Sequence, residues 1–381
     1  MTHEIWMDEA LALAERGRGW VSPNPMVGAV VVRDGNVVGR GWHREFGGPH
    51  AEVFALREAG EAARGAALYC TLEPCNHTGK TPPCTRAIID AGIRTVVLGA
   101  IERNPVADGG IEALRAAGIE VVERIRECEC FRINAPFFKF VDTKTPFVAL
   151  KWAMSLDGKI ATKTGDSKWI TGESARAHAH LLRSRHDAVL VGIGTVLADD
   201  PALNVRGAAM MSGVRQPRRV VLDSRARTPL TGRLWFHPDD GSAGPLLIVI
   251  SAGIDADGRS RARALRDNGA EIIEAEPDAN GRVLVTSAIR ELGARGVCSI
   301  LVEGGAQVLG ACVDAKIADR AHVFIAPTII GGEMGKTAVG GCGTERVTLA
   351  IGRAFTSMTK FGGDYLIEVP LSVWGHVNEE L

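Results

Sequence analysis

Pro49-His50-Ala51-Glu52, followed by Pro74-Cys75 and then Cys84, is the stretch around which the first half of this sequence is organised. It holds one histidine, one carboxylate and two cysteines, with eight residues between the cysteines. Imidazole and thiolate are ligands that zinc prefers, and three of them leave one tetrahedral position open, as in catalytic zinc sites. The sequence therefore predicts a zinc ion held by His50, Cys75 and Cys84, with Glu52 beside it.

Alternating strand and helix patterns surround this stretch. The β-branched runs over 27–32 and 37–42 meet around Asp34-Gly35, which is typical of a hairpin. Gly47-Gly48-Pro49 interrupts the chain, so we expect a helix over 51–63 with His50 and Glu52 at its first turn. A helix over 5–14, strands over 67–72, 95–100 and 119–123, and helices over 85–91 and 110–117 complete the pattern. This succession predicts an α/β layer structure.

The expected chemistry is hydrolytic. Zinc lowers the pKa of a bound water to about 7, and Glu52 is expected to take the proton of that water and return it to a ring nitrogen and to leaving ammonia. H-x-E followed by P-C and a second cysteine is the pattern of zinc deaminases, which usually have two residues between the cysteines. A structural zinc site, or cysteines that only pack, is the alternative. Packing is the expectation for Cys70, Cys128, Cys130, Cys298 and Cys312.

Length and composition limit the possible classes of protein. A chain of 381 residues favours two domains, and 46% apolar and 23% charged residues are ordinary for a soluble globular protein. The net charge of −1 argues against a general nucleic-acid binder. No run of eighteen apolar residues and no signal-peptide pattern is present. We therefore expect a cytoplasmic protein whose eight cysteines are reduced or act as ligands.

The pattern changes near residues 143–146, which predicts domains over 1–145 and 146–366 and a tail over 367–381. Apolar strands are expected over 147–153, 188–192, 219–222, 246–250, 271–275, 299–302, 322–326 and 365–369, and helices over 174–185, 283–292 and 306–315. These predict a mixed sheet, and no G-x-G-x-x-G supports a Rossmann site. Two glycine-rich segments follow predicted strands, Gly192-Ile193-Gly194-Thr195 and Glu303-Gly304-Gly305-Ala306. Their free backbone amides would suit a pyrophosphate, and tight packing of the backbone is the alternative explanation for the glycines. Residues 197–206 have the composition of a loop.

Several segments of the first half resemble one family. Asn24-Pro25-Met26-Val27-Gly28, Gly41-Trp42-His43, His50-Ala51-Glu52 and Thr71-Leu72-Glu73-Pro74-Cys75 are similar to the deaminase half of bifunctional riboflavin-biosynthesis deaminase/reductases, as is the insert 76–84. The resemblance implies a cytidine-deaminase-like α/β/α domain. Asn24, His43, His77 and Lys80 would bind its substrate. Lys80 follows a glycine and suits a substrate phosphate, with a solvated loop cation as the alternative.

The second half resembles the reductase half of the same family. Lys151-Trp152-Ala153-Met154-Ser155-Leu156-Asp157-Gly158, Ser167-Lys168-Trp169-Ile170-Thr171, the segment 197–206 and Glu303-Gly304-Gly305 carry this resemblance. It implies a dihydrofolate-reductase-like fold with a mixed sheet and NADPH as cofactor. The cofactor would contact Ala153, Trp169, Thr195, Ser224, Gly305, Ala306, Gln307, Val308, Leu309, Gly310 and Ala311. The substrate would contact Lys151, Ser167, Arg183, Asp199, Leu203, Arg206 and Glu303. Arg183 and Arg206 make sense as phosphate clamps, although Arg183 can equally be a surface residue.

The prediction is a fused enzyme with two activities. Zinc-dependent deamination of 2,5-diamino-6-ribosylamino-4(3H)-pyrimidinone 5′-phosphate would be followed by NADPH reduction of its ribosyl group to ribityl. The expected partner is this small phosphorylated pyrimidine, without nucleic acid or membrane, in a possible homo-oligomer. One alternative is a nucleobase or tRNA deaminase fused to an unrelated domain, which would need a basic groove and stacking aromatics. Others are a zinc-stabilised binding module and, for the second half, a non-catalytic oligomerisation domain.

Overall fold

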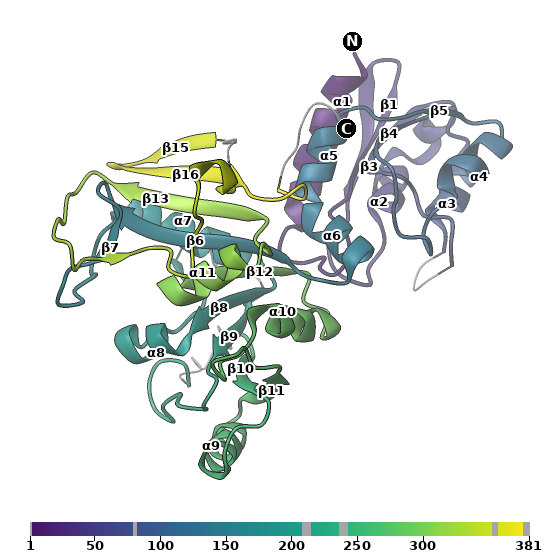
Figure 1. Cartoon of the computed structure of the whole chain (residues 1–381). Coiled ribbons are helices and arrows are strands. Elements are labelled where there is room, and N and C mark those ends of the chain that lie inside the picture. The colour runs from purple at the N-terminus through teal and green to yellow at the C-terminus, as the bar shows by residue number, and fades with distance from the viewer. Residues whose placement is uncertain (1, 79–81, 208–214, 236–242, 353–356, 376–381) are drawn as a thin grey trace. The chain divides into compact units, whose positions relative to one another are not determined.

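The computed structural model describes residues 2–78, 82–207, 215–235, 243–352 and 357–375 (Figure 1). The chain divides into two compact units, one ending at Thr143 and the other beginning at Lys144. Each unit has its own main sheet. None of the helices in the described ranges has the length and apolar character needed to cross a membrane.

The first unit is a five-stranded sheet with helices on both faces. Its strand order is β2-β1-β3-β4-β5; β1 is antiparallel to β2 and β3, and β3, β4 and β5 are parallel. Helices α1 and α5 share one face, where Arg126 pairs with Asp8, while α2 and α3 pack together on the other. The elements are α1 (His3–Ala14), β1 (Gly28–Arg33), β2 (Asn36–Trp42), α2 (Ala51–Ala59), β3 (Ala67–Leu72), α3 (Cys84–Asp90), β4 (Thr95–Ala100), α4 (Gly110–Ala116), β5 (Glu120–Val122), α5 (Glu127–Ile133) and α6 (Ala135–Thr143).

Two glycines bring helix α2 against the sheet. A Cβ atom at Gly41 would lie 2.0 Å from the carbonyl oxygen of Ala51, and one at Gly39 would lie 2.2 Å from that of Ala55. Both separations are far below van der Waals contact, so only glycine allows this approach. Because α2 begins at Ala51, the same contact fixes the position of its first turn, which carries Glu52.

The second unit is a nine-stranded mixed sheet. Its order is β11-β10-β9-β8-β12-β6-β13-β16-β15, parallel from β11 to β13 and antiparallel at the last two pairings. One face packs on α10 and α11, and the other on α8 and α9. The elements are β6 (Phe147–Ser155), β7 (Lys159–Ala161), α7 (Glu173–Ser184), β8 (Ala188–Gly192), α8 (Ile193–Asp199), β9 (Arg218–Leu222), β10 (Leu246–Ser251), α9 (Ala256–Asp267), β11 (Glu271–Ala275), α10 (Val285–Ala294), β12 (Ser299–Gly304), α11 (Ala306–Asp314), β13 (Arg320–Ala326), β14 (Lys336–Thr337), β15 (Ser357–Phe361) and β16 (Asp364–Pro370).

The fold class predicted from the sequence is confirmed, and several elements differ in detail. Sequence patterns missed α5, α6, α9, β7, β14 and β15. The segment 197–206 was predicted to be a loop, yet its first three residues complete α8. Strand β16 continues to Pro370 and pairs with β13, so it crosses the boundary predicted at residue 366. Of the predicted tail, residues 376–381 lie outside the described residues.

Candidate active sites

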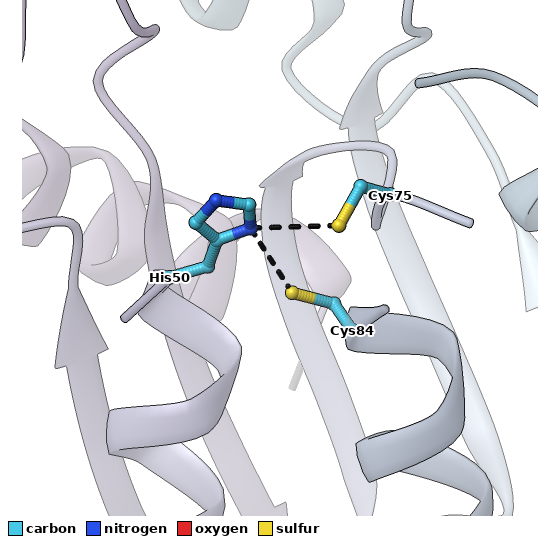
Figure 2. A group of neighbouring side chains, drawn as sticks. All are labelled: His50, Cys75 and Cys84. Carbon is cyan, nitrogen blue, oxygen red and sulfur yellow. Dashed lines mark hydrogen bonds between the residues drawn. The ribbon is translucent and has the colours of Figure 1, made fainter. Parts of the chain in front are cut away.

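Three predicted metal ligands converge at one point of the first unit (Figure 2). His50 immediately precedes α2, Cys75 follows β3 in a loop, and Cys84 is the first residue of α3. The Nδ1 atom of His50 lies 3.2 Å from the sulfur of Cys84 and 3.5 Å from that of Cys75. The backbone N–H of Thr85 donates to the carbonyl of Cys75, which holds the two cysteine-bearing segments together.

These separations suit a tetrahedral zinc ion. Zinc–sulfur bonds of about 2.3 Å and zinc–nitrogen bonds of about 2.0 Å place the ligand atoms roughly 3.5 Å apart. The three ligand atoms here all lie within 4.8 Å of one another. A hydrogen bond from the Cys84 thiol lowers the pKa of Cys75 to about 4, which provides thiolate, the form of sulfur that binds metal. The residues therefore fit the ion that their pattern predicts.

Glu52 lies beside this triad, and it lines one cavity together with His50 and Cys75. The residue is only 3% exposed, and burial raises the pKa of its carboxyl group. Its Oε2 atom is buried and has no hydrogen-bond partner among the described residues. A buried, unsatisfied carboxylate oxygen is costly unless a ligand or water binds to it. Glu52 is thus suited to hold and move a proton at this point.

Asn24 and His43 form a second polar pair on the cavity wall. The carbonyl oxygen of Pro49 can only accept, so Nδ1 of His43 donates to it over 3.1 Å. Burial lowers the pKa of His43, which favours the neutral ring, and its Nε2 then accepts from the Asn24 amide over 3.2 Å. This orientation leaves the Asn24 oxygen available to accept from a ligand.

The segment carrying Asn24 is held by a distant residue. Asn134 is 2% exposed, and its side-chain amide accepts from the N–H of Met26 and donates to the carbonyl of Met26, both over 2.8 Å. The paired bonds imitate a strand pairing. Met26 is therefore fixed from a position 108 residues further along the chain.

The cavity beside the triad has a volume of about 280 Å³ and includes residues that the sequence did not single out. His77 lines it, and so do Glu102, Asn104 and Phe137. Burial raises the pKa of Glu102, and its Oε1 accepts from the N–H groups of Arg103 and Asn104. The polar run Glu102-Arg103-Asn104-Pro105 directly after a buried strand is the signal that could have found them. Lys80 lies outside the described residues.

A larger cavity of about 1210 Å³ lies at the carboxyl ends of the parallel strands of the second unit. Gly304, the last residue of β12, adopts a φ of +124°, a region that glycine alone occupies readily. The chain then passes through Gly305 into α11, so free N–H groups at the start of this helix face the cavity. Ligands of open parallel sheets bind at this edge, and helix N-termini suit phosphate groups.

The predicted cofactor residues divide into two groups. Thr195, Ser224, Gly305, Ala306, Gln307, Val308 and Ala311 line the large cavity. Ala153 and Trp169 are not among its lining residues, and Trp169 is 71% exposed. Leu309 is buried in the hydrophobic core, and a Cβ at Gly310 would lie 2.3 Å from the backbone of Gly340. Neither of these two helix positions faces the cavity, because the 3.6-residue period turns them towards the sheet and the neighbouring segment.

The predicted substrate residues of the second unit form a buried charge cluster. The guanidinium of Arg183 makes two 2.7 Å bonds to Glu303 and a 2.9 Å bond to the carbonyl of Asn204. Burial alone would raise the pKa of Glu303, but Arg183 and Lys151 hold it at about 2. Burial lowers the pKa of Lys151. Arg183 is thus not the solvated surface residue that was the alternative, because two of its nitrogen atoms bond to Glu303 and its side chain is 15% exposed.

The remaining predicted substrate residues lie in different surroundings. Ser167 and Asp199 line the large cavity, and Arg206 is exposed. Leu203 is 2% exposed and packs in the core. An apolar side chain inside the core has no free surface for a ligand, so only the backbone of Leu203 remains available.

A zinc-binding deaminase site in one unit and a reductase-like mixed sheet with a large cavity in the other define a two-activity deaminase/reductase. The family described as cytidine and deoxycytidylate deaminase zinc-binding region matches residues 1–100, and the RibD C-terminal domain family matches residues 146–367. The riboflavin biosynthesis protein RibD of Actinobacillus pleuropneumoniae is 40% identical over 369 residues, covering 97% of this chain and 95% of that protein. That of Bacillus amyloliquefaciens is 42% identical over 362 residues, covering 95% and 94%.

Solved structures agree with these relatives. The Thermotoga maritima deaminase/reductase superposes with a TM-score of 0.82 at 37% identity, covering 97% of this chain and 98% of that one. RibD of Acinetobacter baumannii gives a TM-score of 0.84 at 35% identity, with the same coverage. This chain belongs to the RibD family, the bifunctional deaminase and reductase enzymes of riboflavin biosynthesis.

Replacing Cys84 by serine should remove zinc from the first unit. A hydroxyl is a far poorer zinc ligand than a thiolate, so we expect the metal content of purified protein to fall from one equivalent to near zero, with ammonia release lost in parallel. Atomic absorption measures the metal. Cys70→Ser, at a buried cysteine outside the triad, is the matched control and should keep its zinc. Full zinc content in Cys84→Ser would show that Cys84 is not a ligand.

Proposed function

We propose that this chain performs two consecutive reactions on one phosphorylated pyrimidine. The first is hydrolytic deamination of 2,5-diamino-6-ribosylamino-4(3H)-pyrimidinone 5′-phosphate. The second is reduction by NADPH of the ribosyl group of the product, giving 5-amino-6-ribitylaminouracil 5′-phosphate. The observation that carries the proposal is the convergence of the His50, Cys75 and Cys84 triad with buried Glu52 on one polar cavity.

In the deaminase step His50, Cys75 and Cys84 would hold zinc, which supplies a Lewis acid that makes water acidic near neutral pH. Glu52 accepts one proton from the attacking water and passes it to the ring nitrogen, and it then carries the second proton of that oxygen to the amino group. The carbon–nitrogen bond breaks, ammonia leaves, and a carbonyl remains. The unsatisfied Oε2 of Glu52 supports this role.

Recognition of the pyrimidine is proposed to come from the polar cavity wall. The Asn24 oxygen, oriented by His43, accepts from a ring N–H or amino group. Glu102 and Asn104 line the same cavity and present further polar groups to the edge of the ring. His77, whose Nδ1 is buried without a partner among the described residues, and Lys80 are proposed to bind the ribosyl phosphate side.

In the reductase step the large cavity would bind NADPH, which supplies hydride. The start of α11 and Thr195 are proposed to bind its diphosphate. Lys151 lies on β6 within electrostatic range of Glu303 and Arg183, and it is proposed as the polar group at the reaction centre. NADPH bound there would supply hydride to the ribosyl carbon of the opened form, and a proton from solvent would complete the reduction at the adjoining nitrogen.

A coupled assay on the zinc-loaded chain tests the proposal. The diaminopyrimidinone ribosylamine phosphate is supplied with NADPH, and ammonia release and loss of NADPH absorbance are followed together. Ammonia followed by NADPH oxidation is the expected result. Ammonia without NADPH oxidation would refute the reductase assignment, and neither signal with zinc bound would refute the substrate.

We also propose a cellular location, a class of partner and an oligomeric state for this protein. A cytoplasmic location agrees with eight cysteines that form no disulfide among the described residues. A small-molecule substrate, without nucleic acid, agrees with the near-neutral charge of the chain. Self-association stays a prediction, which sedimentation of the purified protein would test.

A further inference from the structure

Glu73 is a buried carboxylate that the reaction steps proposed above do not use. It directly follows strand β3, two residues before the proposed zinc ligand Cys75, and it is only 5% exposed. Its backbone N–H donates to the carbonyl of Ala100, the last residue of β4, over 3.0 Å, which places the side chain at the end of that strand. A carboxylate is costly to bury unless hydrogen bonds satisfy its oxygens. The charge of Glu73 therefore depends on the donors around it.

Both oxygens of Glu73 accept hydrogen bonds from backbone N–H groups. Its Oε2 accepts from Glu102 over 3.2 Å, and its Oε1 accepts from Gly110 and Ile111 over 2.9 and 3.1 Å. Residues 101–109 connect β4 to α4 and form what we call the β4–α4 loop. Glu102 lies at the start of this loop, and Gly110 comes directly after its end. One carboxylate thus joins the two ends of the loop.

The β4–α4 loop supplies part of the wall of the deaminase cavity. Glu102, Asn104 and Ala107 line this cavity. Within the loop, Oε1 of Glu102 accepts from the N–H of Asn104 over 2.9 Å, and the carbonyl of Asn104 accepts from the N–H of Ala107 over 2.8 Å. These bonds shape the loop internally. Contacts with other segments must then fix its position against the zinc ligands.

Two other attachments of the loop are longer or more exposed than those of Glu73. The N–H of Asn76 donates to the carbonyl of Ala107 over 3.4 Å. Arg103 pairs with Asp142 over 3.3 Å, and their side chains are 42% and 31% exposed. Exposed ion pairs contribute little to stability, whereas hydrogen bonds to a buried charge are among the stronger ones. We therefore expect Glu73 to carry much of the attachment.

Gly110 lets the start of α4 approach the segment that carries Cys75. A Cβ atom at Gly110 would lie 2.0 Å from the carbonyl oxygen of Pro74 and 3.2 Å from Oε1 of Glu73. The first separation is far below van der Waals contact, so only glycine allows this approach. The end of the loop is therefore fixed directly against the metal-binding segment.

We propose that Glu73 is a positioning residue for the deaminase reaction, which holds the β4–α4 loop so that Glu102 and Asn104 face the pyrimidine. The assignment rests on the proposed deaminase function of the first unit. Glu73 also lines the cavity, but three N–H groups engage its oxygens, so it acts through the loop. An amide in place of the carboxylate would turn its NH₂ group towards one of these donors and release that end of the loop.

Glu73→Gln in the zinc-loaded full chain tests the assignment, because glutamine has nearly the same shape. The KM for the diaminopyrimidinone ribosylamine phosphate should rise about tenfold, the effect of losing one hydrogen bond to a charged group. The kcat of ammonia release and the zinc content should stay close to wild type, because Glu52 and the zinc ligands are unchanged. Hydrogen exchange at the amides of Glu102, Gly110 and Ile111 should become faster, which reports the loss of the bonds directly.

Two further variants serve as controls. Glu112→Gln changes an exposed glutamate in the first turn of α4, and its KM should equal that of wild type. Glu73→Asp keeps the charge but is one methylene shorter, so it should reach fewer of the donors and give an intermediate KM. NADPH oxidation with pre-formed deaminated substrate should be unchanged in all three variants, which shows that the second unit is folded.

The other outcomes separate this assignment from the deaminase function. An unchanged KM in Glu73→Gln, with active wild-type protein, would overturn the role of Glu73 and leave deamination standing. Loss of zinc, or a fall in kcat without a change in KM, would mean that Glu73 supports the metal site and not the loop, which would also overturn the assignment. Wild-type protein that releases no ammonia would refute the proposed substrate together with the role of Glu73 in binding it.

Discussion

Glu52→Gln is expected to lower the rate of ammonia release by about 10²- to 10⁴-fold, the usual contribution of a positioned general acid–base group. Glutamine has nearly the same shape, so it fills the buried position of Glu52 without a cavity. It cannot accept a proton from water, which removes the proposed proton transfer. The zinc content should remain at one equivalent because the three ligands are unchanged, and NADPH oxidation with pre-formed deaminated substrate should match wild type.

Single-turnover ammonia release, with metal analysis on the same samples, measures this effect. Glu58→Gln changes an exposed glutamate on the same helix and should leave the rate unchanged. If Glu52→Gln released ammonia at the wild-type rate with zinc bound, a different group would have to move the proton.

Glu303→Gln is expected to destabilise the sheet of the second unit by about 3–5 kcal/mol, the typical cost of removing one partner from a buried ion pair. The side chains of Arg183 and Glu303 are only 15% and 8% exposed. Neutralising Glu303 leaves Arg183 with a buried charge that no carboxylate balances, and it removes the anion beside Lys151. NADPH oxidation should fall together with stability, whereas ammonia release should persist.

Hydrogen exchange of the β8 and β12 amides reports the local free energy of opening and measures this loss directly. The matched control is Glu291→Gln, which removes a carboxylate from the more exposed pair with Arg295. That change should cost less than about 1 kcal/mol. Equal effects of the two substitutions would mean that the buried pair contributes no more than a surface one.

The contrast between these two sites shows what a sequence can predict. The sequence identified the metal site because zinc ligands come from few types of side chain. Here they occur in a characteristic order, with a glutamate close to the first ligand; the residues are His50, Glu52, Cys75 and Cys84. Glu303 and Arg183 lie 120 residues apart. The family resemblance named both residues as substrate contacts, but no local sequence pattern shows that they face each other. The ion pair between Arg183 and Glu303 therefore became visible only in the structure.

The missed helices have a similar physical explanation. Helix α9 buries only Gly258, Ala262 and Leu265, so its apolar stripe is narrow and made mostly of small residues. Helices α5 and α6 mix charges with aromatic residues, which hides the helical period. Their stability comes from contacts with the sheet, as where Cys130 packs against Gly99, and such contacts are invisible in a local pattern.

The amide of Asn134 also has a consequence for the order in which the protein matures during synthesis. A nascent chain that ends at residue 100 already contains His50, Glu52, Cys75 and Cys84, and it contains every strand of the first sheet except β5. It lacks the residue that fixes Met26, two positions from Asn24. The metal ligands therefore leave the ribosome well before Asn134, the residue that holds Met26. We therefore expect that zinc can bind before the contact between Asn134 and Met26 has formed.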